Sequence, residues 1–159
     1  MSDGAVDSPG VRFPPPLLYA VVAAFAWWAD TCWPWRPAPG AVENAAELAG
    51  AALAVAGLAL DLGSLALFWR AGTSPLPFRG STAFVARGPY RFTRNPMYLG
   101  MTLLVAGLGG VTGRLVLVVA ALLAALLIDR FVIPREERHL EHRFGDSYRD
   151  YKRRVRRWL

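Results

Sequence analysis

Two segments of this chain combine residue types that could hold a charged small molecule. The first, RGPYRFTRNPMYLG at residues 87–100, supplies guanidinium groups, tyrosines and a helix start marked by proline. The second, PREER at residues 134–138, supplies the adjacent carboxylates Glu136 and Glu137. Arginines and a helix N-terminus bind anions, and carboxylates accept hydrogen bonds from amino and hydroxyl groups. Together these groups predict a site for a ligand with both charged and aromatic parts.

Most of these residues also have a simpler interpretation. The arginines suit lipid phosphates, and Asn95 and Pro96 suit a plain helix cap. Glu136 suits an ordinary acid in a first helical turn. Glu137 is harder to explain in this way, because its spacing from Ile133 and Leu140 places it on an apolar helix face.

Composition points to a membrane protein of one domain. The chain has 159 residues, of which 54% are hydrophobic, and its mean hydropathy is +0.28. The formal charge of +6 gathers between apolar runs, which favours lipid headgroups over nucleic acid as partners. One cysteine cannot form an internal disulfide, and together with two histidines it is too little for a metal site.

The apolar pattern predicts an all-α integral membrane fold with about four transmembrane helices. The last two form a C-terminal hairpin, and amphipathic cytoplasmic helices follow it. Residues 1–15 are expected to be a disordered lead-in, and residues 16–159 a single membrane domain. The predicted spans are residues 17–33, 45–69, 97–111 and 115–133, and the cytoplasmic tail is residues 134–159.

The hairpin brings the two polar segments together. Only TGR, residues 112–114, separates the third span from the fourth, so the two helices should be antiparallel. Asn95 is the expected N-cap of the third span and Pro96 its first residue. The start of the third span and the end of the fourth near Ile133 therefore lie at one membrane face. The two polar segments should meet there.

Charges in the loops predict the orientation. Arginines concentrate in the linker at residues 70–94 and in the tail, so the linker and both termini should be cytoplasmic. In the tail, Pro134 is expected to start a helix, Gly145 to end it and Asp146 to cap the next. That last helix, with its apolar face continuing to Trp158, is expected to lie on the membrane surface.

The second span carries one carboxylate within its apolar length. Gly50, Gly57 and Ser64 recur every seven residues and form a stripe of small residues that lets helices approach closely. Asp61 shares that face, where a charge costs several kcal/mol unless it contacts protein or water. A hydrogen-bonded structural aspartate is the favoured interpretation. A place beside the route of a lipid substrate is the alternative.

The order of these motifs resembles a known family. GPYRFTRNPMYLG, a glycine-rich hairpin and then REERHLEHRFGDSYRDYKRRVRRWL together resemble the isoprenylcysteine carboxyl methyltransferases, which are related to the membrane phospholipid methyltransferases. The resemblance covers residues 72–159. It implies a membrane methyltransferase that uses S-adenosylmethionine, bound near the cytoplasmic ends of the last two spans and enclosed by the C-terminal segment.

The resemblance also assigns residues by position. The cofactor-binding positions that it implies are Tyr90, Arg94, Asn95, Pro96, Tyr98, Gly100, Glu136 and Glu137. Arg94 and Glu137 are expected to position the cofactor, and no residue is assigned to catalysis. Many members have histidine at the position of Asn95. Asparagine cannot titrate near neutral pH, so a general base at this position is not expected. Candidate substrate contacts are Asp61, Tyr148 and Tyr151.

The methyl acceptor is expected to be a lipid or a lipidated small molecule. An isoprenylcysteine-type carboxylate needs no base, whereas a phospholipid amine must lose a proton. A sterol-type membrane reductase using NADPH and a non-catalytic lipid-binding protein are the competing hypotheses. The alanine- and arginine-rich composition suits a bacterial inner-membrane protein, and the sequence predicts no oligomeric state.

Overall fold

The computed structural model describes residues 14–34, 41–70, 72 and 86–159, and these residues are almost entirely helical. The predicted lead-in, residues 1–15, falls outside them except for its last two residues. A short 3-10 turn, η1, spans Gly88–Arg91, and a π-helical turn, η2, spans Ile128–Val132. The α-helices are α1 (Pro15–Cys32), α2 (Ala41–Arg70), α3 (Pro96–Val111), α4 (Leu115–Leu127), α5 (Ile133–Phe144) and α6 (Asp146–Arg154).

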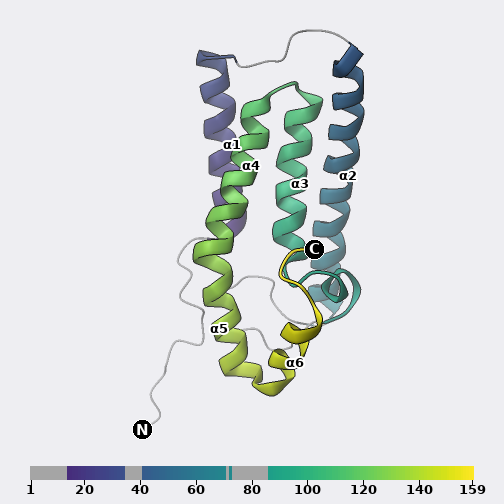
Figure 1. Ribbon diagram of the computed structural model, residues 1–159, viewed down its shortest axis with the longest axis vertical. Coiled ribbons are helices and arrows are strands. Elements are labelled where there is room, and N and C mark those ends of the chain that lie inside the picture. Colours follow the sequence, from purple (N-terminus) through teal and green to yellow (C-terminus); the bar gives the residue numbers. More distant parts are fainter. Residues whose placement is uncertain (1–13, 35–40, 71, 73–85) are drawn as a thin grey trace.

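Four helices lie side by side and form the body of the molecule (Figure 1). The α3–α4 hairpin occupies the middle, with α2 packed against α3 and α1 packed against α4. Its turn is residues 112–114, where Gly113 adopts a φ of 64°. The predicted antiparallel hairpin is confirmed, and the start of α3 lies at the same end of the bundle as α5, η1 and α6.

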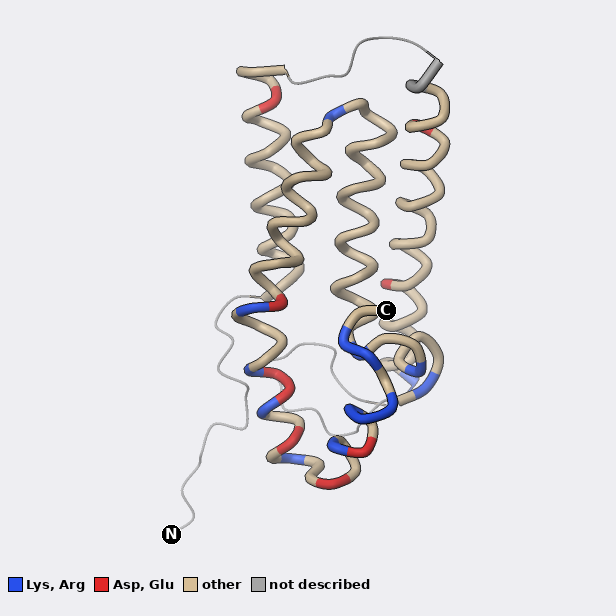
Figure 2. The backbone as a smooth tube through the Cα atoms, in the orientation of Figure 1, with Lys and Arg blue, Asp and Glu red and all other residues tan. Residues whose placement is uncertain are grey.

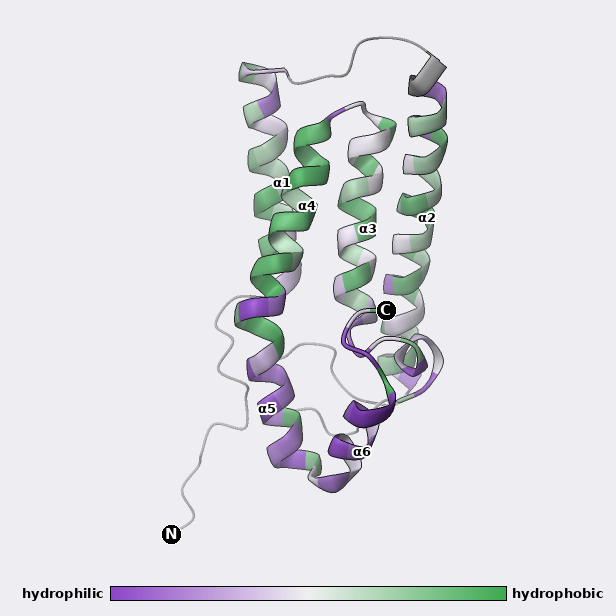
Figure 3. Ribbon diagram, viewed as in Figure 1, coloured by the Kyte–Doolittle hydropathy of each residue, from purple (hydrophilic) through white to green (hydrophobic). Residues whose placement is uncertain are grey.

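The exposed surface of the bundle is apolar along most of its length. Of the described helices, two are long and apolar enough to cross a membrane, Asn44–Arg70 and Leu115–Phe144, and α3 is a shorter apolar helix. Figure 3 shows mainly hydrophobic residues over α1–α4 and hydrophilic residues over α5 and α6. The all-helical fold is therefore as expected. The number of four spans and their orientation stay predictions.

Glycines allow α2 and α3 to pack almost backbone to backbone. A Cβ atom on Gly107 would lie 2.5 Å from both the amide nitrogen of Ala54 and the carbonyl oxygen of Gly50. One on Gly57 would lie 2.5 Å from the carbonyl oxygen of Gly100. No real side chain tolerates such distances, so the small-residue stripe does bring α2 against its neighbour, as the sequence predicts.

The helix continues through Pro134, contrary to prediction. The chain stays helical from α4 through η2 into α5, and Pro134 lies in the first turn of α5. Proline lacks the N–H that a regular helix needs, and its ring crowds the preceding turn. A π-turn inserts an extra residue just before that point and so accommodates the proline without ending the helix. The helix that carries Glu136 and Glu137 is therefore continuous with α4 of the apolar bundle.

The C-terminal residues depart from the predicted surface helix. Gly145 has a φ of 53° and forms the junction, and Asp146 is the first residue of α6 rather than a separate cap. α6 ends at Arg154, and residues 155–159, which we term the C-terminal strap, run back to the start of α3. The amide of Arg94 donates to the carbonyl of Arg156 at 2.9 Å. The predicted apolar helix face beyond Arg154 does not exist, because the backbone pairs with residues 93–94 instead.

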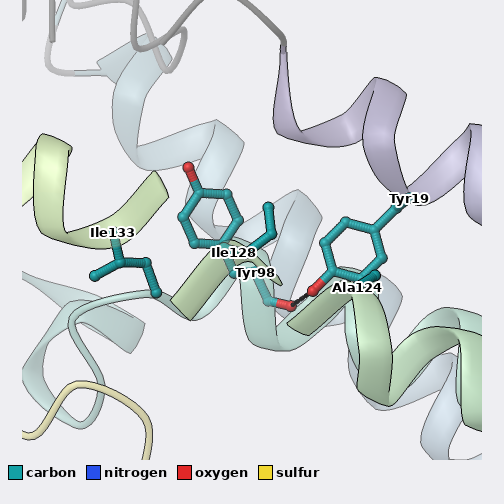
Figure 4. Packing of buried hydrophobic residues seen from close by; sticks show 5 residues of the cluster. All are labelled: Tyr19, Tyr98, Ala124, Ile128 and Ile133. Carbon is teal, nitrogen blue, oxygen red and sulfur yellow. Dashed lines mark hydrogen bonds between the residues drawn. The ribbon is translucent and has the colours of Figure 1, made fainter. Parts of the chain in front are cut away.

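Aromatic and aliphatic side chains join the helices where the hairpin meets the charged segments. The Tyr19 hydroxyl contacts Thr102 Oγ1 at 2.7 Å and donates to the Tyr98 carbonyl at 3.3 Å. This packing holds the start of α3 against α1 and against the segment from the end of α4 to the start of α5. The buried cluster drawn in Figure 4 is Tyr19, Tyr98, Ala124, Ile128 and Ile133.

Candidate functional site

Charged residues gather at one end of the bundle, where α5, α6, η1, the start of α3 and the C-terminal strap meet (Figure 2). We term this the charged end. Far fewer charges lie along the four apolar helices. Both polar segments found in the sequence, residues 87–100 and 134–138, contribute to this end.

Glu137 lies at the centre of the charged end. It is only 5% exposed, while Ile133, one turn earlier, is fully buried, so the predicted inward face of α5 is confirmed. Its carboxylate is 3.3 Å from Arg94 Nη2, 3.0 Å from Arg157 Nη2 and 3.5 Å from Lys152 Nζ. Cationic side chains from three segments therefore converge on one buried carboxylate.

Glu136 faces a different partner. The Tyr98 hydroxyl donates to Glu136 Oε1 at 2.6 Å, which joins the first turn of α3 to the first turn of α5. With the Arg94–Glu137 pair, this contact confirms that the two polar segments meet in space. The adjacent glutamates thus point into neighbouring parts of one site.

Asn95 precedes α3 but does not cap it with its side chain. Its Nδ2 donates instead to the Arg157 carbonyl at 3.0 Å, and Thr93 Oγ1 donates to the same oxygen at 3.0 Å. Among the described residues, no side-chain hydrogen bond caps the N-terminus of α3. The predicted N-cap position is correct, but the predicted capping bond is wrong, because the strap competes for the amide. The first-turn N–H groups of α3 keep their capacity to bind an anion.

Arg94 has unused hydrogen-bonding capacity. Its side chain is 10% exposed, and Nη2 contacts Glu137. Nε and Nη1 are buried and have no hydrogen-bond partner among the residues that the structure describes. Buried guanidinium donors are rarely left unsatisfied, so these two nitrogens have the capacity to bind acceptor atoms of a ligand.

Tyr90 and Tyr151 hold η1 against its neighbouring helices. Tyr151 donates its hydroxyl to the Tyr90 carbonyl at 2.7 Å, and the Tyr90 ring meets Phe68 of α2 edge-on at 5.8 Å. Tyr148 and Tyr151 are 2% and 5% exposed. Burial raises the pKa of the Tyr90, Tyr148 and Tyr151 phenols, so they act as neutral donors. The contact of Tyr148 and Tyr151 with substrate stays a prediction.

Asp61 and Gly100 face each other across the α2–α3 interface. A Cβ atom on Gly100 would lie 2.7 Å from Asp61 Cγ and 2.8 Å from the Gly57 carbonyl oxygen. Asp61 Oδ1 is buried and lacks a hydrogen-bond partner within the described part of the chain. Gly100 is therefore needed to make room for the Asp61 carboxylate. The favoured prediction is a structural aspartate with hydrogen-bonded oxygens, and within the described residues Oδ1 has no such partner.

Asp129 and Arg157, which no sequence motif singled out, complete the site. Asp129 Oδ1 accepts hydrogen bonds from Trp158 Nε1 at 2.9 Å and from Arg157 Nη1 at 3.3 Å. Hydrogen bonding to Glu137 raises the pKa of Arg157, with a smaller contribution from Asp129. The spacing of Asp129, Ile133 and Glu137 by four residues could have revealed Asp129. Nothing in the sequence pairs Arg157 with it.

Known proteins resemble this chain over most of its length. Residues 45–147 match the profile of the phospholipid methyltransferase family. An uncharacterized protein of Haemophilus influenzae is 41% identical over 63 residues, which are 40% of this chain and 100% of that protein. The nickel-cobalt-cadmium resistance protein NccN of Alcaligenes xylosoxydans xylosoxydans is 30% identical over 139 residues. That alignment covers 87% of this chain and 57% of NccN. No solved structure matches significantly.

Proposed function

Because the chain belongs to the phospholipid methyltransferase family, we propose that it transfers a methyl group from S-adenosylmethionine to a lipid-like acceptor in the membrane. The observation that carries this proposal is the pair of buried, unpartnered Arg94 nitrogens beside two glutamates and an uncapped helix start. S-adenosylmethionine has a carboxylate, an amino group and ribose hydroxyls, which match these three features. The family supports methyl transfer over the nicotinamide-dependent reduction that the sequence left open.

Each group would hold one part of the cofactor. Arg94 and the N-terminus of α3 at Asn95–Pro96 would bind its carboxylate through charge-assisted hydrogen bonds. Glu136 and Glu137 would accept hydrogen bonds from its amino group or its ribose hydroxyls. Tyr98 orients Glu136 through the 2.6 Å hydrogen bond, and Gly100 keeps the first turn of α3 open. The bound cofactor supplies a methyl group on a positive sulfur.

The remaining requirement is alignment of the acceptor in a place that excludes water. Holding the two reactants about 3 Å apart and in line supplies much of the rate of such a transfer. The strap and α6 would shield the site, because the strap already pairs with residues 93–94 before α3 and Tyr151 of α6 binds η1. We propose a lipid acceptor that reaches the site from the bilayer. One candidate acceptor is an isoprenylcysteine-type carboxylate. The alternative acceptor is a phospholipid amine, which the family match supports.

Cofactor binding tests this function directly. Arg94→Lys keeps one positive charge near Glu137 but removes the forked donors, so affinity for S-adenosylmethionine should fall by about tenfold. Isothermal titration calorimetry on the full-length protein in detergent measures the change. Arg149→Lys is the matched control, because the Arg149 side chain is 60% exposed in α6. Equal affinities of the wild type and the Arg94→Lys variant would remove Arg94 from the site, and a wild type that does not bind would refute the function.

A further inference from the structure

Asp129 is a carboxylate to which the proposed cofactor site assigns no role. It lies in η2, on the helix that leads to Glu137. Its Oδ1 atom accepts two hydrogen bonds from the C-terminal strap, one from Trp158 Nε1 at 2.9 Å and one from Arg157 Nη1 at 3.3 Å. Hydrogen bonds to a charged group are about twice as strong as neutral ones, so this carboxylate anchors the side chains of the strap.

The strap is fixed at a second point, just before α3. The amide of Arg94 donates to the Arg156 carbonyl at 2.9 Å. Thr93 Oγ1 and Asn95 Nδ2 both donate to the Arg157 carbonyl at 3.0 Å. These bonds use only backbone oxygens of the strap. The strap is thus held before α3 by its backbone and at η2 by its side chains.

The anchored strap covers groups that we propose to hold the cofactor. Arg157 extends from the strap to Glu137, with Nε 3.3 Å from Oε1 and Nη2 3.0 Å from Oε2. Glu137 is 5% exposed, and the Arg94 side chain is 10% exposed. A ligand as large as S-adenosylmethionine needs more access from water than these fractions leave. The strap therefore has to move before such a ligand reaches either residue.

Little buried surface opposes movement of the strap. Trp158 packs against the cluster that contains Tyr98 and Ile133, but Leu159 is 73% exposed. The Arg157 and Asp129 side chains are 33% and 25% exposed, so water can solvate both when they separate. Segments with few buried apolar contacts open at a low cost in free energy. The hydrogen bonds to Asp129 should therefore be a large part of the cost of opening.

We propose that Asp129 is a positioning residue of the methyl-transfer site: it anchors the C-terminal strap, and release of the strap sets the rate at which S-adenosylmethionine enters and leaves. This inference rests on the proposed cofactor site. Entry and exit pass the same strap, so a weaker anchor speeds both by a similar factor and changes the dissociation constant little. A residue that only supports the bound state would speed exit and leave entry unchanged.

The rates of cofactor exchange test this role. Association and dissociation of radiolabelled S-adenosylmethionine are followed by rapid filtration of the full-length protein in detergent. Asp129→Ala removes the acceptor of both hydrogen bonds, so both rate constants should rise about tenfold while Kd stays within about threefold. Trp158→Phe keeps an aromatic ring but loses the Nε1 donor, and it should raise both about threefold. Adding Trp158→Phe to Asp129→Ala should give no further increase, because the contact is already broken.

Asp146→Ala is the matched control. Asp146 pairs with Arg149 at the exposed surface of α6, so its loss should leave both rates at the wild-type values. Unchanged rates in the Asp129→Ala variant overturn the inference, and so does a faster exit with unchanged entry. If Asp129→Ala does not fold, the same two outcomes are read from Trp158→Phe. A wild type that does not bind S-adenosylmethionine refutes the proposed function and the inference with it, whereas the other failures leave the function intact.

Discussion

Asp30 and Asp61 are both carboxylates in apolar helices, and their surroundings differ. Asp30 lies at the end of α1 opposite the charged end, is 2% exposed and pairs with Arg114 of the α3–α4 turn. The Arg114 guanidinium also lies 3.9 Å from the centre of the Trp27 ring. Asp61 has an oxygen with no partner in the described part of the chain. The fold therefore supplies a cation to Asp30, and within the described residues it supplies none to Asp61.

Breaking the Asp30 pair should give the largest effect on stability. Arg114→Ala removes the cation beside a carboxylate that cannot reach water, so the free energy of unfolding should fall by about 3–5 kcal/mol. Thermal unfolding in detergent, followed by circular dichroism, measures the loss. Arg149→Ala at an exposed ion pair is the control and should change the value by less than about 1 kcal/mol. Similar unfolding free energies for the two variants would contradict a structural role for the Asp30–Arg114 pair.

The α2–α3 interface, which positions Asp61, should be the next most sensitive. Gly107→Ala forces a Cβ atom to within 2.5 Å of two backbone atoms of α2, which cannot move independently. We expect a loss of about 1–3 kcal/mol in unfolding free energy. Gly63→Ala meets no atom within 4 Å and should instead be neutral or stabilising by about 0.5–1 kcal/mol. Equal unfolding temperatures of the two variants would contradict the close packing.

Asp61→Asn should change stability least and in the opposite direction to Arg114→Ala. Asp61 Oδ1 is buried without a hydrogen-bond partner among the described residues, so a neutral amide removes a desolvation cost, and stability should stay constant or rise by about 1 kcal/mol. The same unfolding measurement applies. A loss as large as that of Arg114→Ala would erase the contrast between the two aspartates.

Much of the fold follows from the sequence because membrane helices leave a strong local pattern. The apolar runs, the start at Pro96 and the three-residue turn located the α3–α4 hairpin, and the hairpin alone required the two polar segments to meet. The inward direction of Glu137 followed from its four-residue spacing to Ile133. These features depend on neighbours in sequence, which a pattern records.

The features that the sequence did not reveal depend on contacts between distant residues. Asn95 binds the Arg157 carbonyl 62 residues away, so its expected capping bond is absent from α3. The partner of Asp30 is 84 residues away in a turn. Continuation of the helix through Pro134 depends on the π-turn, and no residue type marks such a turn. Local spacing cannot supply either of these two pairings or the π-turn.

The π-turn at Ile128–Val132 decides which way the acidic pair points. Each residue in an α-helix rotates the direction of the next side chain by about 100°, so one residue more or fewer would swing all of α5 around its axis. Deleting one residue there would restore a regular helix and carry Glu137 away from Arg94 without altering either side chain. The direction in which the side chains of α5 point is therefore set by the π-turn in the apolar helix before it.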